Sequence, residues 1–486
     1  MRKKKIKPCH EQVLITDIGA EGKSLARVGE KVVFTDFALP GDVVDLQVTV
    51  SKKRYEEARV VHYHTLSPDR ETPFCGHFGL CGGCRWQHLP YSLQLHYKHK
   101  QVADQLERIG KLSLPELRPI LGSEETRFYR NKLEFSFTAN RWITEVEMGL
   151  QEPELERRGL GFHVPGMFDK VFHVDQCWLQ PEPSNKIRNF LYGYALNHAL
   201  PFYHIRNGEG FLRSLIVRTS SLGEVMVILS FFREDMSLRE KLLISLQREF
   251  PEITSLFYVI NGKGNDTITD QETVLFSGKD HITEEMEGLR FRIGPKSFFQ
   301  TNSRQALELY RCVRELAGLQ GDEVVYDLYS GTGTIGLFLS RHCRKVVGLE
   351  YVREATEDAW VNARTNGREN VRFMAGDIRA LLTPALLQEE GYPSVIITDP
   401  PRSGMHPDVV KAIVEAAPQK IVYVSCNPAT QARDLALTID DYQVSAVQPV
   451  DMFPHTHHVE NIVLLVRKED RRPNPHLQVP EADHQQ

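Results

Sequence analysis

A cysteine, an aspartate, an arginine and a glutamate stand next to short apolar runs in the C-terminal part of the chain. The run IVYV precedes Cys426, the run VIIT precedes Asp399 and Arg402, and Glu460 follows in the segment HVEN. Apolar runs of this length are typical of buried strands, and in an open α/β sheet ligands bind beyond the strand ends. We therefore expect these side chains to converge. A thiol beside carboxylates and an arginine suits covalent chemistry on a planar electrophile.

The length and composition of the chain limit the classes of protein to consider. At 486 residues and 55.6 kDa it is too long for one compact core, which predicts two to four domains. Its 41% hydrophobic and 25% charged residues are typical of a folded, water-soluble protein. No apolar run approaches the roughly 18 residues of a membrane span, and no apolar segment of a signal peptide follows the basic start. We expect a cytoplasmic protein without membrane association.

The charge of the chain gives no direct indication of its partner. The net charge is −5 and the pI is about 6.5, which argues weakly against nucleic acid. Basic residues nevertheless gather locally, at 2–7, 52–54 and 127–132. Each group taken alone is typical of a solvated surface, so an RNA partner needs support from other features.

Four of the eight cysteines have a spacing that indicates a metal centre. Cys75, Cys81 and Cys84 follow the pattern C-x5-C-x2-C in a glycine-rich loop, and Cys177 is a candidate fourth ligand. Four thiolates suit either zinc or an iron-sulfur cluster. Structural zinc usually uses paired C-x2-C knuckles, and only one such pair is present. The sequence therefore favours the iron-sulfur cluster, with zinc as the alternative.

The pattern of apolar residues changes along the chain. Residues 13–61 alternate β-rich runs with glycines, which predicts a small antiparallel barrel of a kind that often binds nucleic acid. Residues 91–109 have helical periodicity, and residues 127–294 are mostly strands with one helix near 239–250. From residue 310 strands and helices alternate, which predicts a doubly wound parallel sheet.

A glycine-rich turn follows the first strand of this predicted sheet. Gly331, Gly333 and Gly336 form G-x-G-x-x-G, whose glycines let the backbone approach a cofactor at a helix N-terminus. Glu350 closes the next strand, where a carboxylate accepts hydrogen bonds from ribose hydroxyls, and Asp377 closes the third. These features fit NAD and S-adenosylmethionine equally well.

The later motifs separate a dehydrogenase from a methyltransferase. A dehydrogenase gives no reason for Asp-Pro-Pro-Arg after the fourth strand or for a cysteine after the fifth. Amino-group methyltransferases use a related Asp-Pro-Pro-aromatic turn, whose ring holds the target base, and here Arg402 replaces the ring. The sequence therefore favours methylation of carbon, with an NAD-dependent dehydrogenase as the alternative.

Five motifs in order resemble the RNA uridine carbon-5 methyltransferases of the RumA and TrmA type. They are SFFQTN at 297–302, DLYSGTGT at 327–334, DPPRSG at 399–404, SCNP at 425–428 and HVE at 458–460. Residues 13–62 look like a TRAM RNA-binding barrel, and the four cysteines look like the [4Fe-4S] ligands of the RumA branch. The TrmA type lacks both, so the RumA branch is the closer match. It implies 23S rRNA as substrate, with tRNA as the runner-up.

The resemblance implies a role for particular residues. Cys426 is expected to add to carbon 6 of the uracil as nucleophile, and Glu460 to remove the proton from carbon 5. Phe298 and Arg402 are expected to face the substrate base. The expected S-adenosylmethionine contacts are Gln300, Tyr329, Gly331, Gly333, Thr334, Glu350, Asp377 and Asp399. One departure is that Thr332 and Thr334 stand where these motifs often carry asparagine.

The resemblance also implies a division of the chain and a monomeric protein. The expected parts are a TRAM-like barrel at 1–64, a β-rich iron-sulfur domain at 65–90 and 126–294, a Rossmann-like class I methyltransferase domain at 91–125 and 295–468, and a disordered tail at 469–486. A non-catalytic RNA-binding iron-sulfur protein is the alternative from another class. Such a protein would have no need to keep Cys426, Glu460 and the acid-lined glycine turn together.

Overall fold

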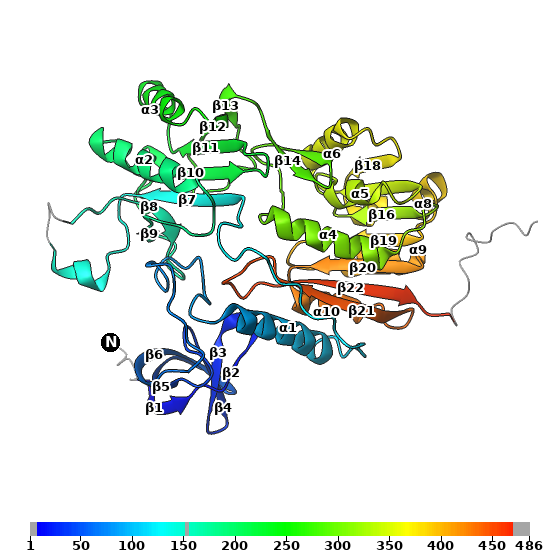
Figure 1. Cartoon of the computed structure of the whole chain (residues 1–486), viewed down its shortest axis with the longest axis horizontal. Coiled ribbons are helices and arrows are strands. Elements are labelled where there is room, and N and C mark those ends of the chain that lie inside the picture. Colours follow the sequence, from blue (N-terminus) through cyan, green and yellow to red (C-terminus); the bar gives the residue numbers. More distant parts are fainter. Residues whose placement is uncertain (1–6, 151–154, 470–486) are drawn as a thin grey trace, which may run out of the picture. The chain divides into compact units, whose positions relative to one another are not determined.

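The computed structural model describes residues 7–150 and 155–469 (Figure 1). The chain divides into two compact units. The first comprises Met1–Lys98, Ser123–Ile282 and Phe453–His458, and the second comprises His99–Gly122, Thr283–Met452 and Val459–Gln486. The expected disorder of the tail falls, apart from residue 469, outside the described residues, and the finer domain boundaries stay a prediction. No helix in the described ranges is long and apolar enough to cross a membrane.

The N-terminal sheet has six strands in the order β1-β5-β6-β4-β3-β2. Alternate residues of β5 are buried, and they pack with Val33 and Ala26 in a small core. All its strand pairs are antiparallel except β4 with β6, which is parallel. A short helix, η1 (Ala20–Gly22), joins two of its strands. The strands are β1 (Cys9–Leu14), β2 (Asp17–Ile18), β3 (Ser24–Val28), β4 (Lys31–Thr35), β5 (Val43–Ser51) and β6 (Tyr55–Thr65).

A second sheet in the first unit has seven strands in the order β13-β12-β11-β10-β7-β8-β9. Its central strands β10 and β11 are buried along almost their whole length, as their apolar runs predict. The strands are β7 (Lys132–Thr138), β8 (Gly159–His163), β9 (Val171–His173), β10 (Leu212–Thr219), β11 (Val225–Phe231), β12 (Ile253–Ile260) and β13 (Val274–Gly278).

Two helices pack on this second sheet, and the sequence predicted one of them. The expected helix is α3 (Met236–Glu249), whose first turn is capped by the Asp235 side chain accepting from the Leu238 amide at 3.1 Å. The other is α2 (Ser184–Asn197), which buries Ile187, Arg188 and Leu191. Because its buried face carries polar as well as apolar residues, the apolar periodicity of the sequence does not indicate this helix. A short helix, η2 (Glu145–Gly149), also lies in this unit.

The second unit contains a seven-stranded sheet in the order β18-β17-β16-β19-β20-β22-β21. The first five strands along the chain are parallel, and β22 lies antiparallel between β20 and β21. The predicted doubly wound sheet is confirmed. The strands are β16 (Val324–Leu328), β17 (Lys345–Glu350), β18 (Val371–Ala375), β19 (Val395–Thr398), β20 (Lys420–Ser425), β21 (Tyr442–Val450) and β22 (Glu460–Arg467).

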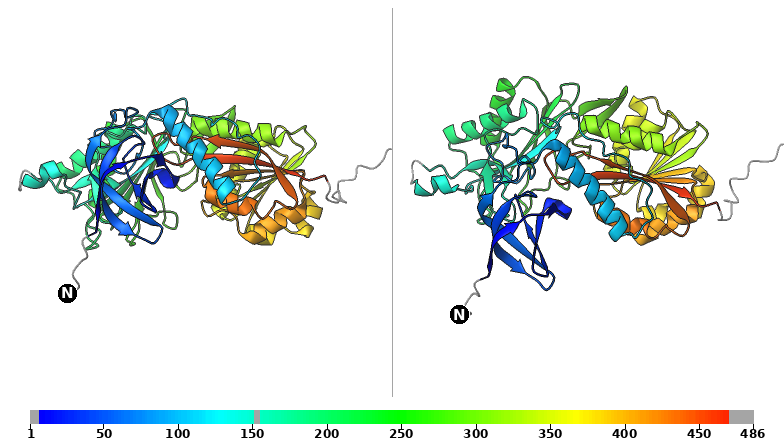
Figure 2. Two further views of the ribbon diagram at one scale, coloured as in Figure 1. Left: turned by 90° about the horizontal axis from the view of Figure 1, so that it is seen from below. Right: turned by 60° about the horizontal axis from the view of Figure 1, so that its bottom comes forward.

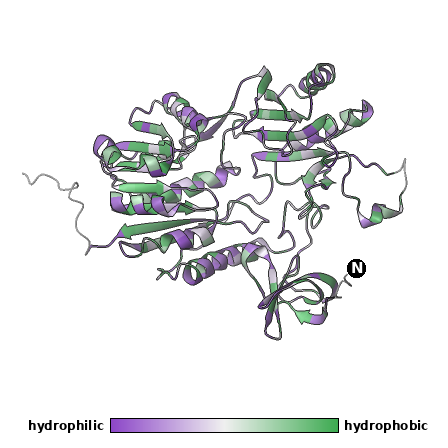
Figure 3. Cartoon of the chain, turned by 180° about the vertical axis from the view of Figure 1, so that it is seen from behind, coloured by the Kyte–Doolittle hydropathy of each residue, from purple (hydrophilic) through white to green (hydrophobic). Residues whose placement is uncertain are grey.

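Helices cover both faces of this sheet. Figure 2 shows α4 on one face, and α9 and α10 on the other. Apolar side chains concentrate in the strands between them, as the colours of Figure 3 show. A hairpin of β14 (Ile282–Met286) and β15 (Leu289–Ile293) precedes α4, and α1 (Tyr91–Arg108) begins in the first unit and ends in the second. The other helices are α4 (Ser303–Ala317), α5 (Thr334–Leu339), α6 (Arg353–Thr365), α7 (Ile378–Leu381), α8 (Pro384–Glu390), α9 (Pro407–Ala416) and α10 (Pro428–Leu435).

Candidate active site

The predicted nucleophile and base face each other at one edge of the second unit's sheet. Cys426 directly follows β20, and Glu460 is the first residue of β22. The two strands are antiparallel, and their last registered pair at this edge is Ser425 with Asn461. Cys426 and Glu460 are the next residues along the two strands beyond that pair, and the charge of Glu460 acts on the Cys426 thiol. Residues 34 apart in sequence thus become neighbours.

Hydrogen bonds from Asn427 fix the loop that carries Cys426. The Asn427 side chain caps α10 by accepting from the Ala429 amide at 3.2 Å, and the next residue, Pro428, suits the first helical position. The Asn427 Nδ2 also donates to the carbonyl of Arg402 at 3.2 Å. The Thr430 hydroxyl donates to the same carbonyl, also at 3.2 Å. The cysteine loop and the Asp-Pro-Pro-Arg loop are thereby tied together.

A pair of buried amides fixes Glu460 from the other side. Asn461 Nδ2 donates to Gln431 Oε1 at 2.7 Å, and Gln431 Nε2 donates to the carbonyls of Tyr423 and Asn461 at 2.9 and 3.2 Å. Both side chains are fully buried. Asparagine before proline indicates a helix cap in the sequence, but nothing local indicates the contact of Gln431 with Asn461.

Burial and like charges raise the pKa values of the three acidic groups at this edge. Burial, followed by the charges of Glu460 and Asp399, raises the pKa of the Cys426 thiol to about 12. Burial and then Asp399 raise the pKa of Glu460 to about 8, and burial raises that of Asp399 to about 7. The positive charge of Arg402 acts in the opposite sense on Cys426 and Glu460. The site is thus poised to exchange protons near neutral pH.

Two exposed side chains in the second unit remain available to a ligand. Arg402 is exposed, and no carboxylate of the described residues lies within ion-pair distance of its guanidinium. Phe298 is 70% exposed, between buried Ser297 and Phe299. Ser297 Oγ donates to Asp358 at 2.6 Å, which attaches this segment to α6. An exposed phenyl ring on an anchored segment is suited to stacking on a planar group.

The glycine turn after β16 has the geometry of a cofactor loop. The Gly331 amide donates to Glu350 Oε2 at 2.9 Å, and Glu350 Oε1 accepts from the Val352 amide at 2.8 Å. Gly331 has a positive φ of 54°, and a Cβ placed on it meets no protein atom within 4 Å. The turn therefore leaves open space beside the carboxylate, as a nucleoside cofactor requires.

Gly333 packs inward instead. Its φ is 78°, and a Cβ there would lie 2.8 Å from Phe373 Cζ and 3.0 Å from Ala359 Cβ. Below it, buried Asp327 accepts from the Gly336 amide at 2.8 Å, and burial raises the pKa of this carboxyl to about 7. The glycine is needed because the turn lies directly against side chains of β18 and α6.

The expected cofactor residues Tyr329, Thr334 and Asp377 lie at or beside the ends of strands of this sheet, and Gln300 lies before α4. Tyr329 directly follows β16 with a strained φ of 62°, and Thr334 Oγ1 accepts from the Tyr310 hydroxyl at 3.3 Å. Asp377 follows β18, caps α7 and forms an ion pair with Arg379. Gln300 lies two residues before Asn302, which caps α4. These positions agree with a cofactor pocket at the strand ends, and the individual contacts stay predictions.

The four clustered cysteines converge in the first unit. Cys84 and Cys177 belong to the core of the second sheet, and Cys81 packs against it. Burial first, and then the charges of the other cysteines, raise the pKa of Cys81 to about 11 and that of Cys84 to about 12. All four are free thiols. Gly82 is required between them, since its φ is 73° and a Cβ would lie 2.5 Å from Pro165 Cγ.

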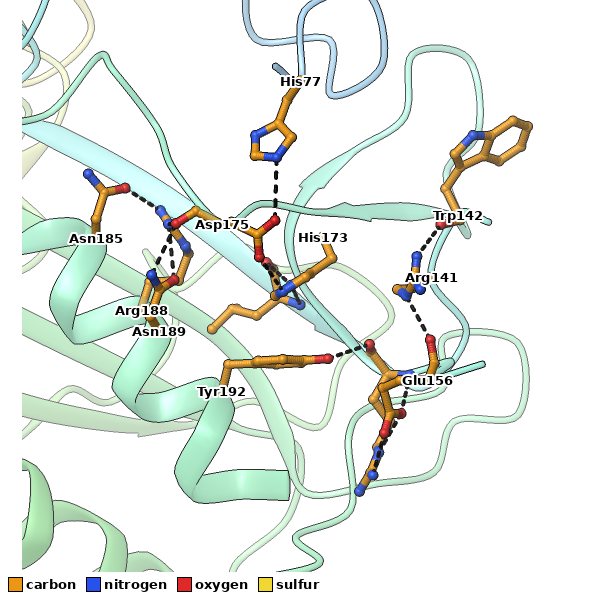
Figure 4. Close-up of polar contacts among 12 residues, drawn as sticks. His77, Arg141, Trp142, Glu156, His173, Asp175, Asn185, Arg188, Asn189 and Tyr192 are labelled. Carbon is orange, nitrogen blue, oxygen red and sulfur yellow. Dashed lines mark hydrogen bonds and ion pairs between the residues drawn. The ribbon is translucent and has the colours of Figure 1, made fainter. Parts of the chain in front are cut away.

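Polar contacts hold this cysteine region together (Figure 4). The Asp175 carboxylate lies 3.6 Å from His77 Nε2 and 3.3 Å from His173 Nε2, and so links the loop of Cys75 to the segment of Cys177. Within the described ranges, no three His, Cys, Asp or Glu side chains are placed as ligands of a single metal ion. The donor set of four thiols nevertheless matches what a cluster core would need.

The fold and the strand-end site define a class I methyltransferase. Residues 267–468 match the family model "tRNA (Uracil-5-)-methyltransferase", and residues 11–61 match the TRAM domain. A Bacteroides thetaiotaomicron protein described as an uncharacterized RNA methyltransferase is 57% identical over 451 residues, which cover 92% of this chain and 99% of that protein. A Porphyromonas gingivalis protein with the same description is 54% identical over 93% of this chain and 99% of its own length.

A solved structure agrees with these matches. The tRNA (uracil-54, C5)-methyltransferase of Pyrococcus abyssi, in complex with S-adenosyl-L-homocysteine, superposes with a TM-score of 0.72. It is 28% identical, and the match covers 94% of this chain and 100% of that one. The chain therefore belongs to the RNA uracil-5-methyltransferases, which selects the methyltransferase over the dehydrogenase.

Proposed function

We propose that this protein transfers a methyl group from S-adenosylmethionine to carbon 5 of a uridine in RNA, through a transient bond between Cys426 and carbon 6. The observation that carries the proposal is the opposition of Cys426 and Glu460 at the end of β20 and β22. A thiol and a carboxyl in adjoining positions provide the two groups that this reaction needs on one uracil ring. Their elevated pKa values are consistent with proton exchange at the site.

The cofactor supplies the methyl group, and the glycine turn supplies its binding place. Glu350 accepts hydrogen bonds from the ribose hydroxyls, and the open face of Gly331 lets the backbone approach the methionine portion. Gln300, Tyr329, Thr334, Asp377 and Asp399 complete the pocket in this proposal. The Pyrococcus abyssi enzyme, bound to S-adenosyl-L-homocysteine, supports this assignment.

Cys426 activates the uracil ring by adding to carbon 6. The bond from Sγ to carbon 6 forms, and the electrons of the ring double bond move toward carbon 5 and oxygen 4. The thiol proton passes to the ionised carboxylate of Asp399, whose pKa is about 7, so that the Glu460 carboxylate stays available for the later proton. Arg402 lowers the pKa of Cys426 and so favours the thiolate.

Glu460 completes the reaction by removing a proton. Once carbon 5 has taken the methyl group, its remaining proton passes to the Glu460 carboxylate, the ring double bond forms again, and the bond to Sγ breaks. No group of the described residues donates a hydrogen bond to this carboxyl, which leaves it available to the substrate. The products are 5-methyluridine and S-adenosyl-L-homocysteine, and Cys426 is regenerated.

The target uridine must leave its stack to reach Cys426. A paired base shields carbon 6, so the uridine lies in a loop or is flipped out, and exposed Phe298 stacks on it. The TRAM barrel contacts RNA phosphates, for which the exposed basic residues 52–54 between β5 and β6 are suited. These contacts read the folded RNA around the uridine.

The favoured substrate is 23S rRNA, on the resemblance of the four cysteines and the TRAM barrel to the RumA branch. Transfer RNA is the second candidate, which the likeness to a tRNA (uracil-54, C5)-methyltransferase favours. Mapping 5-methyluridine in both RNAs from cells with and without the gene distinguishes them. Loss of the base from neither RNA would contradict the proposed reaction.

We further propose that Cys75, Cys81, Cys84 and Cys177 bind a [4Fe-4S] cluster that holds the first unit together. The convergence of four free thiols beside an apolar core supports it. Methyl transfer through Cys426 needs no electron, so the cluster is structural. Anaerobically purified protein should be brown, with iron and sulfide in equal amounts. Colourless protein that contains zinc would overturn the iron assignment.

A further inference from the structure

Arg188 places a positive charge inside the first unit, and no carboxylate of the described residues forms a hydrogen bond or an ion pair with it. The charges of Cys177, Asp175 and Glu182 act on it from further away. The side chain lies on α2 and is fully buried. Its guanidinium donates to Asn185 Oδ1 at 2.9 Å, to Asn189 Oδ1 at 3.1 Å and to the carbonyl of Asp175 at 2.5 Å (Figure 4). All three acceptors are uncharged oxygens, and in the described part of the chain its Nε has no hydrogen-bond partner.

Such an arrangement is costly unless a negative charge lies nearby. Removing a charge from water costs several kcal/mol, and uncharged acceptors recover only part of it. Two other buried arginines of this unit show the usual solution, since Arg213 forms an ion pair with Asp266 at 2.9 Å and Arg239 forms one with Glu234 at 3.1 Å. Arg188 forms no such pair, and the carboxylates of Asp175 and Glu182 act on its charge only from beyond ion-pair distance. A counter-charge closer to the guanidinium would offset more of the cost.

Asn185 connects Arg188 directly to a cysteine of the cluster. Its Oδ1 accepts from Arg188 and also from the Cys177 amide at 2.8 Å, and its Nδ2 donates to the Cys177 carbonyl at 3.0 Å. Cys177 and Arg188 act on each other's charge, and Phe135 lies 5.1 Å from the guanidinium on another side. The guanidinium is thus positioned at the rim of the cysteine cluster.

We propose that Arg188 is the counter-cation of a dianionic four-thiolate metal centre at Cys75, Cys81, Cys84 and Cys177. The inference rests on the proposed metal centre. Four thiolates around a core of double positive charge form a dianion, and Arg188 offsets part of it. Without the metal this dianion is absent, and Arg188 keeps only the weaker influence of the more distant Asp175 and Glu182 carboxylates. Arg188 is a positioning residue for the centre and touches neither RNA nor the methyl donor.

A charge-neutral variant tests this by the sign of its effect on stability. The melting temperature of full-length Arg188→Met is measured in protein as purified anaerobically and in protein stripped of metal with a chelator. We expect the variant to melt below the wild type with the metal present and above it without. Arg213→Met is the matched control and should melt below the wild type in both states. Equal losses for Arg188→Met in both states would overturn the proposal.

The reduction potential of the iron-sulfur cluster gives a second test, which does not require metal-free protein. Loss of a cation disfavours the more negative reduced cluster, so the midpoint potential of Arg188→Met should move to more negative values. A tenfold loss in the equilibrium constant for reduction corresponds to about 59 mV for a one-electron couple. Arg188→Lys should stay nearer the wild type. An unchanged potential in Arg188→Met would contradict the proposal.

The two proposals fail in different ways. Protein that contains neither iron nor zinc after anaerobic purification would remove the metal centre, and the role of Arg188 with it. Protein that contains the cluster but shows equal melting losses and an unchanged potential would remove the role of Arg188 alone. A zinc centre is also a dianion, so for zinc the melting temperatures decide.

Discussion

The carboxyl of Asp399 acts through space on the carboxyl of Glu460. Burial is the larger cause, and the charge of Asp399 the next, of a Glu460 pKa of about 8. Asp399 itself has a pKa of about 7. Near pH 7 the proposed base is therefore mostly protonated in the free protein, although it must be ionised to take a proton from the substrate. The protonation state of this pair should govern the reaction.

The rate of methylation should rise with pH. The Glu460 carboxylate becomes more abundant as the pH increases through about 8. We expect a rise of roughly tenfold per pH unit below the Glu460 pKa, where one deprotonation limits the rate. Single-turnover transfer of labelled methyl groups to substrate RNA between pH 6 and 9 measures it. A rate that is flat over this range would contradict ionisation of Glu460 as a requirement.

The raised pKa of Glu460 also predicts how stability depends on pH. The folded state holds this proton up to about pH 8, whereas an unperturbed glutamate loses it near 4.5. Stability from this group is therefore present below pH 4.5 and is lost as the pH rises to about 8. Glu460→Gln lacks that loss, so its melting temperature should exceed the wild type's at pH 8.5 and approach it at pH 5. The difference in unfolding free energy is on the order of a few kcal/mol.

Glu460→Gln should trap the intermediate. Addition and methyl transfer proceed, but the amide cannot take the carbon 5 proton, so RNA stays bonded to Cys426. Incubation with S-adenosylmethionine and RNA should give a protein–RNA adduct that survives denaturation, with product release slowed about 10²–10⁴-fold. Glu284→Gln, at a fully buried carboxyl of the β14–β15 hairpin, is the control. Release of product at the normal rate from Glu460→Gln would exclude Glu460 as the base.

Cys426→Ala should form neither adduct nor product. Without the thiol, carbon 5 of the ring is too poor a nucleophile to take the methyl group. Gel shift should still detect RNA binding, since the TRAM barrel is unchanged. Cys312→Ala, at a half-buried thiol on α4, should retain activity as the matched control. Residual product from Cys426→Ala would refute nucleophilic catalysis at this position.

The two glycines of the cofactor turn should respond differently to alanine. Both have positive φ, so both substitutions introduce similar backbone strain of about 1 kcal/mol. Gly331→Ala adds a methyl group in open space, where we expect at least tenfold weaker S-adenosylmethionine binding by calorimetry. Gly333→Ala adds one 2.8 Å from Phe373 Cζ and should lower the melting temperature further. Unchanged cofactor affinity in Gly331→Ala would place the cofactor elsewhere.

The strands of the second unit were predictable because each is short, apolar and bounded by turn residues. The runs before Tyr329, Asp399 and Cys426 are β16, β19 and β20, and the glycine turn leads into α5 as its pattern predicts. The helix α2 was not predicted. It buries Asn185 and Arg188 on the face that packs inward, and polar residues on that face break the periodicity from which a helix is recognised.

The sequence by itself determined which residues are the candidates for the chemistry, because strand ends, glycine turns and the order of motifs are local properties of the chain. Tertiary structure alone decided that Glu460 stands opposite Cys426, since an antiparallel strand inserted between β20 and β21 brings it there. It also decided the pKa of Glu460 and the burial of Arg188 among uncharged hydrogen-bond acceptors. Both depend on burial and on neighbours distant in the chain, which no local pattern specifies.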